Sequence, residues 1–228
     1  MITSQKLIAP LIALALIALH TSRAAAGPET TDAAAGDSSG WTDLLSPETE
    51  KLGEHWRTSG NWALENGVAT LTPRPGEEGW SRFEAYLWSK KKYGDFLIEF
   101  DYKLQEHGNS GFYFRVGDRN DPVQQGIEVQ LYESASKPKD AKLTDHDAGG
   151  IIPGVPPKKR NSKPAGQWNT MRVKNVGGRL VVTLNGVVVN RVDLSQKPFA
   201  ERPREGWIGF QDHAMPISLR NVRIREVK

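Results

Sequence analysis

Six polar side chains that could bind or transform a polar ligand recur within residues 94–132. This polar set consists of Glu99, Asp101, Tyr113, Arg115, Glu128 and Gln130. Its members alternate with apolar residues at every second position, as expected for half-buried β-strands. Because alternate side chains of a strand point to opposite faces, we expect the apolar residues to build a core and the polar set to share the other face.

Two carboxylates of the polar set could act as a pair. Glu99 and Asp101 are two residues apart on one predicted strand, so their Cα atoms should lie roughly 6–7 Å apart. A retaining glycosidase needs two carboxyl groups about 5–5.5 Å apart, one as acid and one as nucleophile. The alternative is a charged, solvent-exposed strand face with no chemical role.

Arg115 and Glu128 fall on neighbouring predicted strands. In one interpretation, Arg115 stabilises negative charge on a ligand while Glu128 moves a proton. In the other, they form a structural ion pair on the sheet face. The two roles compete, because a neighbouring arginine lowers the basicity of a carboxylate.

Two histidines are further candidates for proton transfer. His146 lies between Asp145 and Asp147 in a predicted loop, and His213 follows Asp212 at the end of a predicted strand. Loops at the rim of a β-sandwich often carry function, although a surface position is the alternative for both. The Asp145–Asp147 group could also bind a divalent cation, whereas no His/Cys spacing typical of zinc is present.

Many short alternating segments separated by glycine, asparagine and proline indicate an all-β sandwich or barrel. The Asn66-Gly67 and Asn185-Gly186 pairs predict tight hairpin turns of type I′. A strand is predicted over residues 83–88. Residues 133–165 lack periodicity, which predicts a long functional loop, and we expect its part 145–160 to close over the polar face.

The first 26 residues read as a secretory signal: Lys6, an apolar run over residues 7–19, and small residues at 24–26. An uncleaved membrane anchor is the alternative, although the run is short for a bilayer. The small and polar composition of residues 27–40 predicts a disordered linker. The length of residues 41–228 predicts a single domain. The chain is therefore expected in the periplasm or outside the cell, with no membrane contact after cleavage.

Composition restricts the partners and the covalent chemistry. The chain has no cysteine, which excludes disulfides, and its net charge is +3 over 228 residues. Basic clusters such as residues 90–92 and 158–160 are more typical of solvated loops than of a nucleic-acid site. We therefore expect no nucleic-acid partner.

Several of these residues stand in an ordered set of motifs. The set is Asn109-Ser110-Gly111, Glu128-Val129-Gln130, Trp168-Asn169, Asn185-Gly186, Gln211-Asp212-His213 and Arg220-Asn221. It resembles the 3-keto-disaccharide hydrolase domain family over residues 41–228. The resemblance implies a concanavalin A-like jelly roll of two antiparallel sheets, with the ligand on the concave face.

The resemblance also implies an exported enzyme that acts on glycosides oxidised at C3. A C3 ketone acidifies the C2 proton, so a base can remove it, the C1 oxygen can leave, and water can add back. Glu128, His146 or His213 could be the base, and Arg115 or a divalent cation could stabilise the enolate. The remaining candidates for substrate binding are Glu99, Asp101, Asn109, Tyr113, Gln130 and Asp212.

Two other classes of function fit the same pattern. A lectin-like module would use a similar face to hold sugar without chemistry, and a structural domain would have that face covered. The sequence leaves open the sugar and its linkage, the identity of the base, any need for a metal, and the oligomeric state.

Overall fold

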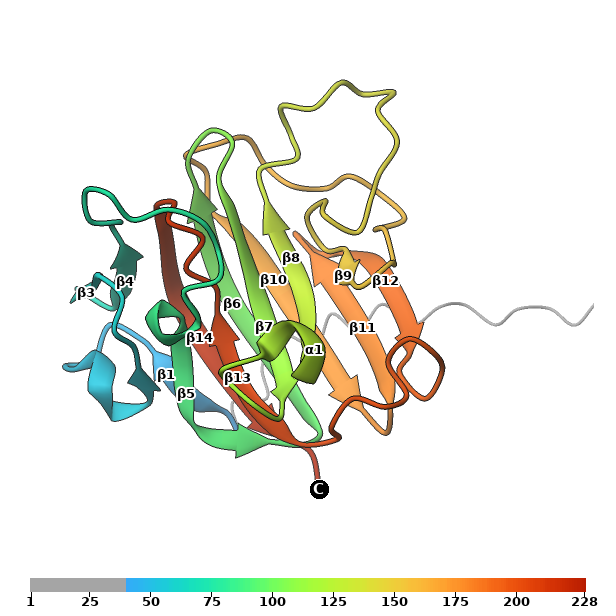
Figure 1. Cartoon of the computed structure of the whole chain (residues 1–228), viewed down its shortest axis with the longest axis horizontal. Coiled ribbons are helices and arrows are strands. Elements are labelled where there is room, and N and C mark those ends of the chain that lie inside the picture. Colours follow the sequence, from blue (N-terminus) through green and yellow to red (C-terminus); the bar gives the residue numbers. More distant parts are fainter. Residues whose placement is uncertain (1–39) are drawn as a thin grey trace, which may run out of the picture. The chain divides into compact units, whose positions relative to one another are not determined.

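The computed structural model describes residues 40–228. The predicted signal segment 1–26 lies outside the described residues, as does the predicted linker 27–40 except for Gly40. The described residues lie within one compact unit and form two antiparallel sheets (Figure 1). The predicted all-β sandwich of two antiparallel sheets is therefore confirmed.

The larger sheet has eight strands in the described part of the chain. Its order is β12 (Val187–Asp193), β11 (Arg179–Leu184), β10 (Asn169–Val176), β6 (Phe96–Leu104), β14 (Ile217–Glu226), β4 (Val68–Leu71) and β3 (Trp62–Glu65), with β1 (Thr42–Leu45) paired to β14. The predicted Asn-Gly turns join β3 to β4 and β11 to β12. All four turn residues have positive φ, from 48° to 79°, as a type I′ turn requires.

The smaller sheet has six strands within residues 40–228. Its order is β2 (Trp56–Arg57), β5 (Leu87–Tyr93), β13 (Gly206–Phe210), β7 (Asn109–Val116), β8 (Ile127–Tyr132) and β9 (Ile151–Ile152). Three short helical turns lie between strands: η1 (Leu52–Glu54), η2 (Phe83–Ala85) and α1 (Pro122–Gln125). No helix among the described residues is long and apolar enough to cross a membrane.

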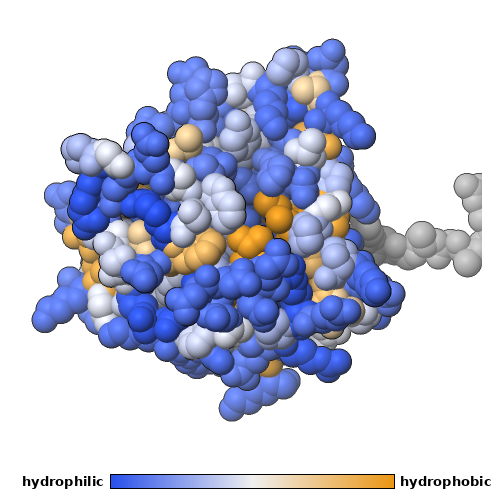
Figure 2. All heavy atoms as spheres, viewed as in Figure 1, coloured by the Kyte–Doolittle hydropathy of each residue, from blue (hydrophilic) through white to orange (hydrophobic). Residues whose placement is uncertain are grey.

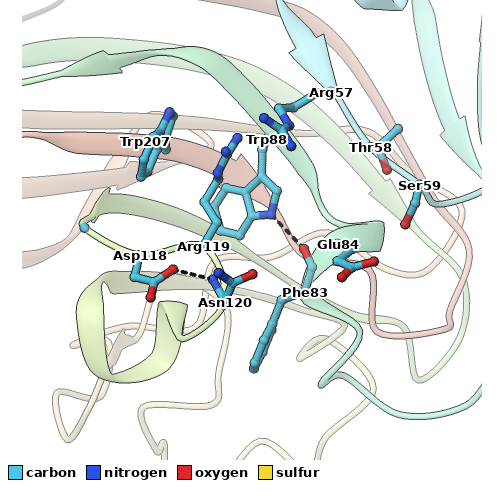
Figure 3. Close-up of a pocket in the computed structure, with 11 residues that line it drawn as sticks. Arg57, Thr58, Ser59, Phe83, Glu84, Trp88, Asp118, Arg119, Asn120 and Trp207 are labelled. Carbon is cyan, nitrogen blue, oxygen red and sulfur yellow. Dashed lines mark hydrogen bonds between the residues drawn. The ribbon is translucent and has the colours of Figure 1, made fainter.

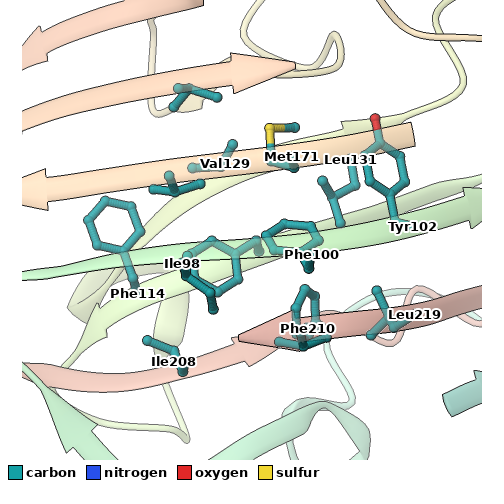
Figure 4. Packing of buried hydrophobic residues seen from close by; sticks show 14 of the residues in the cluster. Ile98, Phe100, Tyr102, Phe114, Val129, Leu131, Met171, Ile208, Phe210 and Leu219 are labelled. Atoms are coloured by element: carbon teal, nitrogen blue, oxygen red, sulfur yellow. The ribbon is translucent and has the colours of Figure 1, made fainter. Parts of the chain in front are cut away.

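The core lies between the two sheets, and aromatic residues dominate its centre (Figure 4). Phe100 of β6 packs against Phe112 of β7, with ring centroids 5.3 Å apart, and meets Phe210 of β13 edge-on at 5.0 Å. Trp80 and Val188 are the large hydrophobic residues that remain exposed in the described part. The visible surface is accordingly mostly hydrophilic, with apolar side chains in a broken band across its middle (Figure 2).

The prediction of one shared polar face is wrong. Strand β6, with Glu99 and Asp101, belongs to the eight-stranded sheet, whereas β7 and β8 belong to the six-stranded sheet. The apolar sides of both sheets meet in the core, so their polar sides point away from each other. Alternation identified the faces within each strand, but it could not show that the β6–β7 connection crosses from one sheet to the other.

Two local predictions are also corrected. The strand predicted over residues 83–88 is divided: residues 83–85 form η2, and β5 begins at Leu87. The basic cluster at residues 90–92 lies on strand β5 and not in a loop, although its side chains are exposed as expected.

Candidate functional site

Glu128 is the buried acid on the outer face of the six-stranded sheet. It is 6% exposed and has Tyr113 of β7 and Ile152 of β9 as its register partners. The carboxylate also occupies the space over Gly111 of β7. A Cβ atom at Gly111 would lie 1.9 Å from Glu128 Oε1, so a glycine is needed there to admit the carboxylate.

Burial gives Glu128 the titration behaviour of a proton acceptor. It raises the pKa of Glu128 to about 7, and the nearby charge of Asp145 acts in the same direction. The Tyr113 hydroxyl donates a hydrogen bond to Glu128 Oε2 at 2.7 Å, which opposes part of the rise in pKa. A group with this pKa can take up and release a proton near neutral pH.

Tyr113 and Tyr86 connect Glu128 to the rest of the face. Their ring centroids are 5.7 Å apart. The Tyr86 hydroxyl donates to the Trp80 carbonyl oxygen at 2.8 Å and accepts from Gln211 Nε2 at 3.0 Å. Burial raises the pKa of both tyrosines, so both remain neutral hydrogen-bond donors at physiological pH.

A cavity of about 640 Å³ lies on the same sheet, beside Trp88 and Trp207 (Figure 3). Its lining includes Arg57, Phe83, Trp88, Arg119, Asn120 and Trp207. The Trp88 indole lies over Gly209, where a Cβ atom would come within 2.2 Å of the ring, and it donates from Nε1 to the Phe83 carbonyl at 2.7 Å. We refer to this space as the Trp88–Trp207 cavity.

The aromatic rings form a continuous path from the cavity to Glu128. Trp88 meets Tyr113 edge-on with ring centroids 6.2 Å apart, and Tyr113 bonds Glu128. Glu128 itself does not line the cavity. The outer face of the six-stranded sheet therefore has two parts, an acid centre and an aromatic cavity, with Tyr113 between them.

Asn109 and Gln130 lie near the acid centre. Gln130 follows Glu128 by two residues on β8, so both side chains occupy the same face, and Gln130 Nε2 donates to Asn109 Oδ1 at 2.5 Å. Gln130 is buried. The structure thus brings together four of the predicted site residues: Tyr113, Glu128, Gln130 and Asn109.

Arg115 does not share the face of Glu128, which corrects the predicted pairing. Trp207 of β13 is opposite Val116, and Gly209 is opposite Tyr113, so β7 carries one extra residue between these positions. This β-bulge, with Arg115 at a φ of 54°, gives the outer-face position to Val116. Alternation fails at a bulge because the extra residue reverses the parity of every position after it.

Arg115 is buried at the end of β7, and its charged neighbours are Asp95 and Arg204. Burial lowers the pKa of its guanidinium. It forms no ion pair with Glu128 in the described residues, and its Nε atom has no hydrogen-bond partner.

Asp212 and the two histidines occupy the rim. Asp212 is fully buried and accepts from Arg82 at 2.6 Å and from the Ala214 backbone at 2.8 Å. His213 is half-buried beside it, whereas the His146 side chain is 71% exposed. Neither histidine hydrogen-bonds Glu128 within residues 40–228.

Glu99 and Asp101 lie on the outer face of the eight-stranded sheet, where arginines neutralise them. Glu99 forms ion pairs with Arg172 and Arg223, and Asp101 with Arg220. The two side chains are only 13% and 14% exposed, so they are held in ion pairs and do not form the solvent-exposed face considered as the alternative. They are remote from Glu128 because the sandwich core lies between the two sheets.

The long loop over residues 133–165 adds strand β9 to the edge of the six-stranded sheet beside Glu128. Residues 148–151 are buried, and a Cβ atom at Gly150 would lie 2.1 Å from the Asp145 carbonyl oxygen. Gly149 and Gly150 therefore form a tightly packed corner, which keeps Asp145 close to Glu128.

The aromatic cavity was not predicted from the sequence. Its aromatic residues come from distant parts of the chain, with Phe83 and Trp88 far from Trp207. Gly111 and Gly209 were a usable signal, because a lone glycine inside a strand indicates close approach of another group. In the described part of the chain, no three His, Cys, Asp or Glu side chains are grouped as metal ligands.

Comparison with known proteins gives a family match. Residues 40–225 match the 3-keto-alpha-glucoside-1,2-lyase-like domain family. A 3-keto-disaccharide hydrolase of Bacteroides thetaiotaomicron is 23% identical over 207 residues, covering 74% of this chain and 71% of that protein.

Solved structures share the fold. A candidate glycosyl hydrolase from Parabacteroides distasonis has a TM-score of 0.68 at 26% identity, covering 82% of this chain and 99% of its own. A second one from the same organism has a TM-score of 0.68 at 21% identity, covering 83% and 95%. The carbohydrate-binding module CBM66 of Bacillus subtilis has a TM-score of 0.52 at 15% identity, covering 82% and 96%. The jelly-roll sandwich is thus common to all four chains.

Proposed function

The chain belongs to the 3-keto-alpha-glucoside-1,2-lyase-like domain family, and on that premise we propose that it cleaves the glycosidic bond of 3-keto glycosides, with Glu128 as the base. The observation that carries the proposal is the buried Glu128 carboxyl, with a pKa of about 7, on the outer face of the six-stranded sheet. An efficient general base has a pKa near the pH at which it works.

The proposed reaction needs one group that can move a proton twice. The Glu128 carboxylate takes the C2 proton of the oxidised sugar, and the electrons of the C2–H bond form the enolate of the C3 ketone. When the ketone re-forms, a C1–C2 double bond forms and the C1–O bond breaks. The leaving oxygen then takes the proton from Glu128.

Water completes the reaction. It adds across the double bond, with its hydroxyl group on C1 and a proton on C2, so the net change is hydrolysis. Tyr113 is the proposed donor to the enolate oxygen, since its raised pKa keeps the hydroxyl protonated. The hydrogen that it donates to Glu128 is released for this role when Glu128 takes up the C2 proton. Tyr113 replaces Arg115 in this role because Arg115 lies off the face.

Gln130 and Asn109 would bind sugar hydroxyls beside Glu128, because their amides offer both donors and acceptors. His213 and His146 are the alternative bases. We also propose, from residues 1–26, that the protein is exported to the periplasm or beyond.

The test uses the purified protein and a 3-keto-disaccharide, with the products measured over time. Glu128→Gln keeps the side-chain shape and removes the proton acceptor, so turnover should fall at least about 10²-fold. Glu106→Gln, at an exposed turn, is the matched control and should retain wild-type turnover. Repeating the assay with a chelator shows whether a divalent cation takes part.

Two outcomes would contradict the proposal. Turnover close to wild type in folded Glu128→Gln would assign the base to His213 or His146. Binding of unoxidised glycans without turnover of any 3-keto sugar would instead assign a lectin-like function.

A further inference from the structure

The Trp88–Trp207 cavity has the chemistry of a site for a neutral sugar. Trp88, Trp207 and Phe83 line the cavity and supply aromatic surface against which the apolar side of a pyranose ring can pack. Trp88 also stacks on Tyr86, and Lys92 and Arg119 lie over the Trp207 ring. The guanidinium groups of Arg57 and Arg119 can donate hydrogen bonds to a ligand, and the carboxylates of Glu84 and Asp118 can accept them. A sugar hydroxyl does both, so a mixed lining of this kind suits a polyol.

Charge argues for a neutral ligand. Two arginines and two acids line the cavity, so their formal charges cancel. Neither Arg57 nor Arg119 forms an ion pair in the described residues; Arg119 stacks on the Trp207 ring at 4.3 Å. An anionic ligand would face Glu84 and Asp118 as well as the arginines.

Distance separates this cavity from Glu128. The strands that carry Trp88 and Glu128 are β5 and β8, with β13 and β7 between them. Three strand spacings separate the two backbones by roughly 14 Å, and the side-chain path from Trp88 through Tyr113 to the Glu128 carboxylate is longer than one sugar ring. A second cavity of about 530 Å³ shares Ser59, Phe83, Glu84 and Asn120 with the first and extends the available surface.

We propose that the Trp88–Trp207 cavity is a distal subsite for a neutral hexose unit of an oligosaccharide whose oxidised unit lies at Glu128. The position of the oxidised unit rests on the proposed function. The neutral-sugar subsite itself does not, because it follows from the lining and size of the cavity. The preferred substrates are then oligosaccharides longer than a disaccharide.

Binding tests the subsite without any reaction. Isothermal titration calorimetry uses unoxidised neutral oligosaccharides of glucose, galactose and mannose with two, three and four units. The three- and four-unit chains should bind about 10-fold more tightly than the two-unit chain of the same sugar, and Trp207→Ala should remove that advantage. Trp168→Ala is the matched control, because Trp168 is a half-buried tryptophan whose ring contacts Lys103 and Arg220 of the eight-stranded sheet.

Three results would each overturn the subsite. They are that no member of the panel binds, that affinity is independent of oligosaccharide length, or that Trp168→Ala and Trp207→Ala weaken binding equally. If Trp207→Ala fails to fold, Asn120→Ala replaces it, since Asn120 is exposed and its hydrogen bond to Asp118 is made by the backbone N–H.

Measurements of turnover distinguish the failure of the subsite from the failure of the proposed hydrolase activity. In Trp207→Ala, the ratio of kcat/KM for a 3-keto trisaccharide to that for a 3-keto disaccharide should fall about 10-fold. Length-dependent binding with no turnover of 3-keto sugars would support the subsite and reject the hydrolase. Turnover with no length dependence would support the hydrolase and reject the subsite.

Discussion

At the scale of single residues, the buried carboxyl of Glu128 should make stability depend on pH. Its pKa is about 7 in the folded chain and 4.5 for an unperturbed Glu, so between these values the folded state binds more protons than the unfolded state. The free energy of unfolding should therefore fall as pH rises from 4.5 to 7 and stay low above 7. The total fall from this one group is roughly 3 kcal/mol.

The check is urea denaturation of wild type and Glu128→Gln at pH 5, 6, 7 and 8. As pH rises, the unfolding free energy of wild type should fall relative to that of Glu128→Gln. Glu106→Gln, exposed in the β6–β7 turn, should follow the wild-type curve. A pH-independent difference between wild type and Glu128→Gln would mean that the carboxyl titrates as an exposed one.

Gly111 offers a second test at this scale. A methyl group there would lie 1.9 Å from Glu128 Oε1, so Gly111→Ala must displace the carboxylate from Tyr113. We expect turnover of a 3-keto-disaccharide to fall at least about 10²-fold, as for loss of the base itself. Stability should fall by about 1–3 kcal/mol, the usual range for overpacking.

Gly94→Ala is the matched control for Gly111→Ala. Gly94 lies in the β5–β6 turn, and a Cβ atom there would meet no other atom within 4 Å. Its turnover and stability should match wild type. Normal turnover in folded Gly111→Ala would show that the position of the Glu128 carboxylate is not critical for the reaction.

At the scale of elements, the bulge in β7 should depend on the backbone of Arg115. Its φ of 54° costs about 1–2 kcal/mol for an ordinary residue and little for glycine. We expect Arg115→Gly to stay within about 1 kcal/mol of wild type, because relief of strain offsets lost packing. Arg115→Val should lose about 2 kcal/mol or more, since a β-branched residue tolerates positive φ poorly.

Urea denaturation of the two variants measures this difference, and the 3-keto-disaccharide assay measures turnover. Since Arg115 lies off the face of Glu128, Arg115→Gly should retain most of its turnover. A loss as large as that of Glu128→Gln would return Arg115 to the reacting centre.

The strands and turns were predictable where a local rule decides them. Asn66-Gly67 and Asn185-Gly186 impose their turns through φ alone, and alternation correctly placed Phe112 and Phe114 in the core and Tyr113 and Glu128 outside. The bulge was not predictable, because Arg115 lacks the glycine that usually marks positive φ. Strand β9 was missed because two residues are too few to show a period.

At the scale of the whole molecule, the arrangement of the two sheets decides which predicted residues meet. Glu99 and Glu128 have the same local pattern, yet they lie on opposite sides of the sandwich. Sheet membership depends on long-range pairing, such as β6 with β10 and β14, which a period of two does not encode. The alternating segments predicted the β-sandwich and the family resemblance its jelly-roll form, whereas only the strand pairing shows which polar residues share a face.

The last prediction follows from that separation. Changing Glu99→Gln and Asp101→Asn together should leave turnover of a 3-keto-disaccharide unchanged, because neither carboxylate reaches the six-stranded sheet. It should lower stability by about 1–2 kcal/mol, the sum expected for two partly exposed ion-pair groups. Loss of turnover comparable to Glu128→Gln would place the reaction on the eight-stranded sheet.

The pH dependence of the single variant Glu99→Gln sharpens this test. Burial tends to raise the pKa of Glu99, but the hydrogen bonds from Arg223 and Arg172 outweigh it and hold the pKa below 4.5. A depressed pKa stabilises the fold above the unfolded value, and the contribution is lost as pH falls through the folded value. The difference in unfolding free energy between wild type and Glu99→Gln, measured by urea denaturation, should therefore reach its maximum by pH 6 and shrink below pH 4.5. For Glu128→Gln, wild type should instead lose stability relative to the variant as pH rises from 4.5 to 7. Glu99 and Glu128 stand in similar strand patterns, yet their stability contributions should depend on pH in opposite directions. The reason is that arginines surround Glu99, whereas Glu128 is buried without a cationic partner among the described residues.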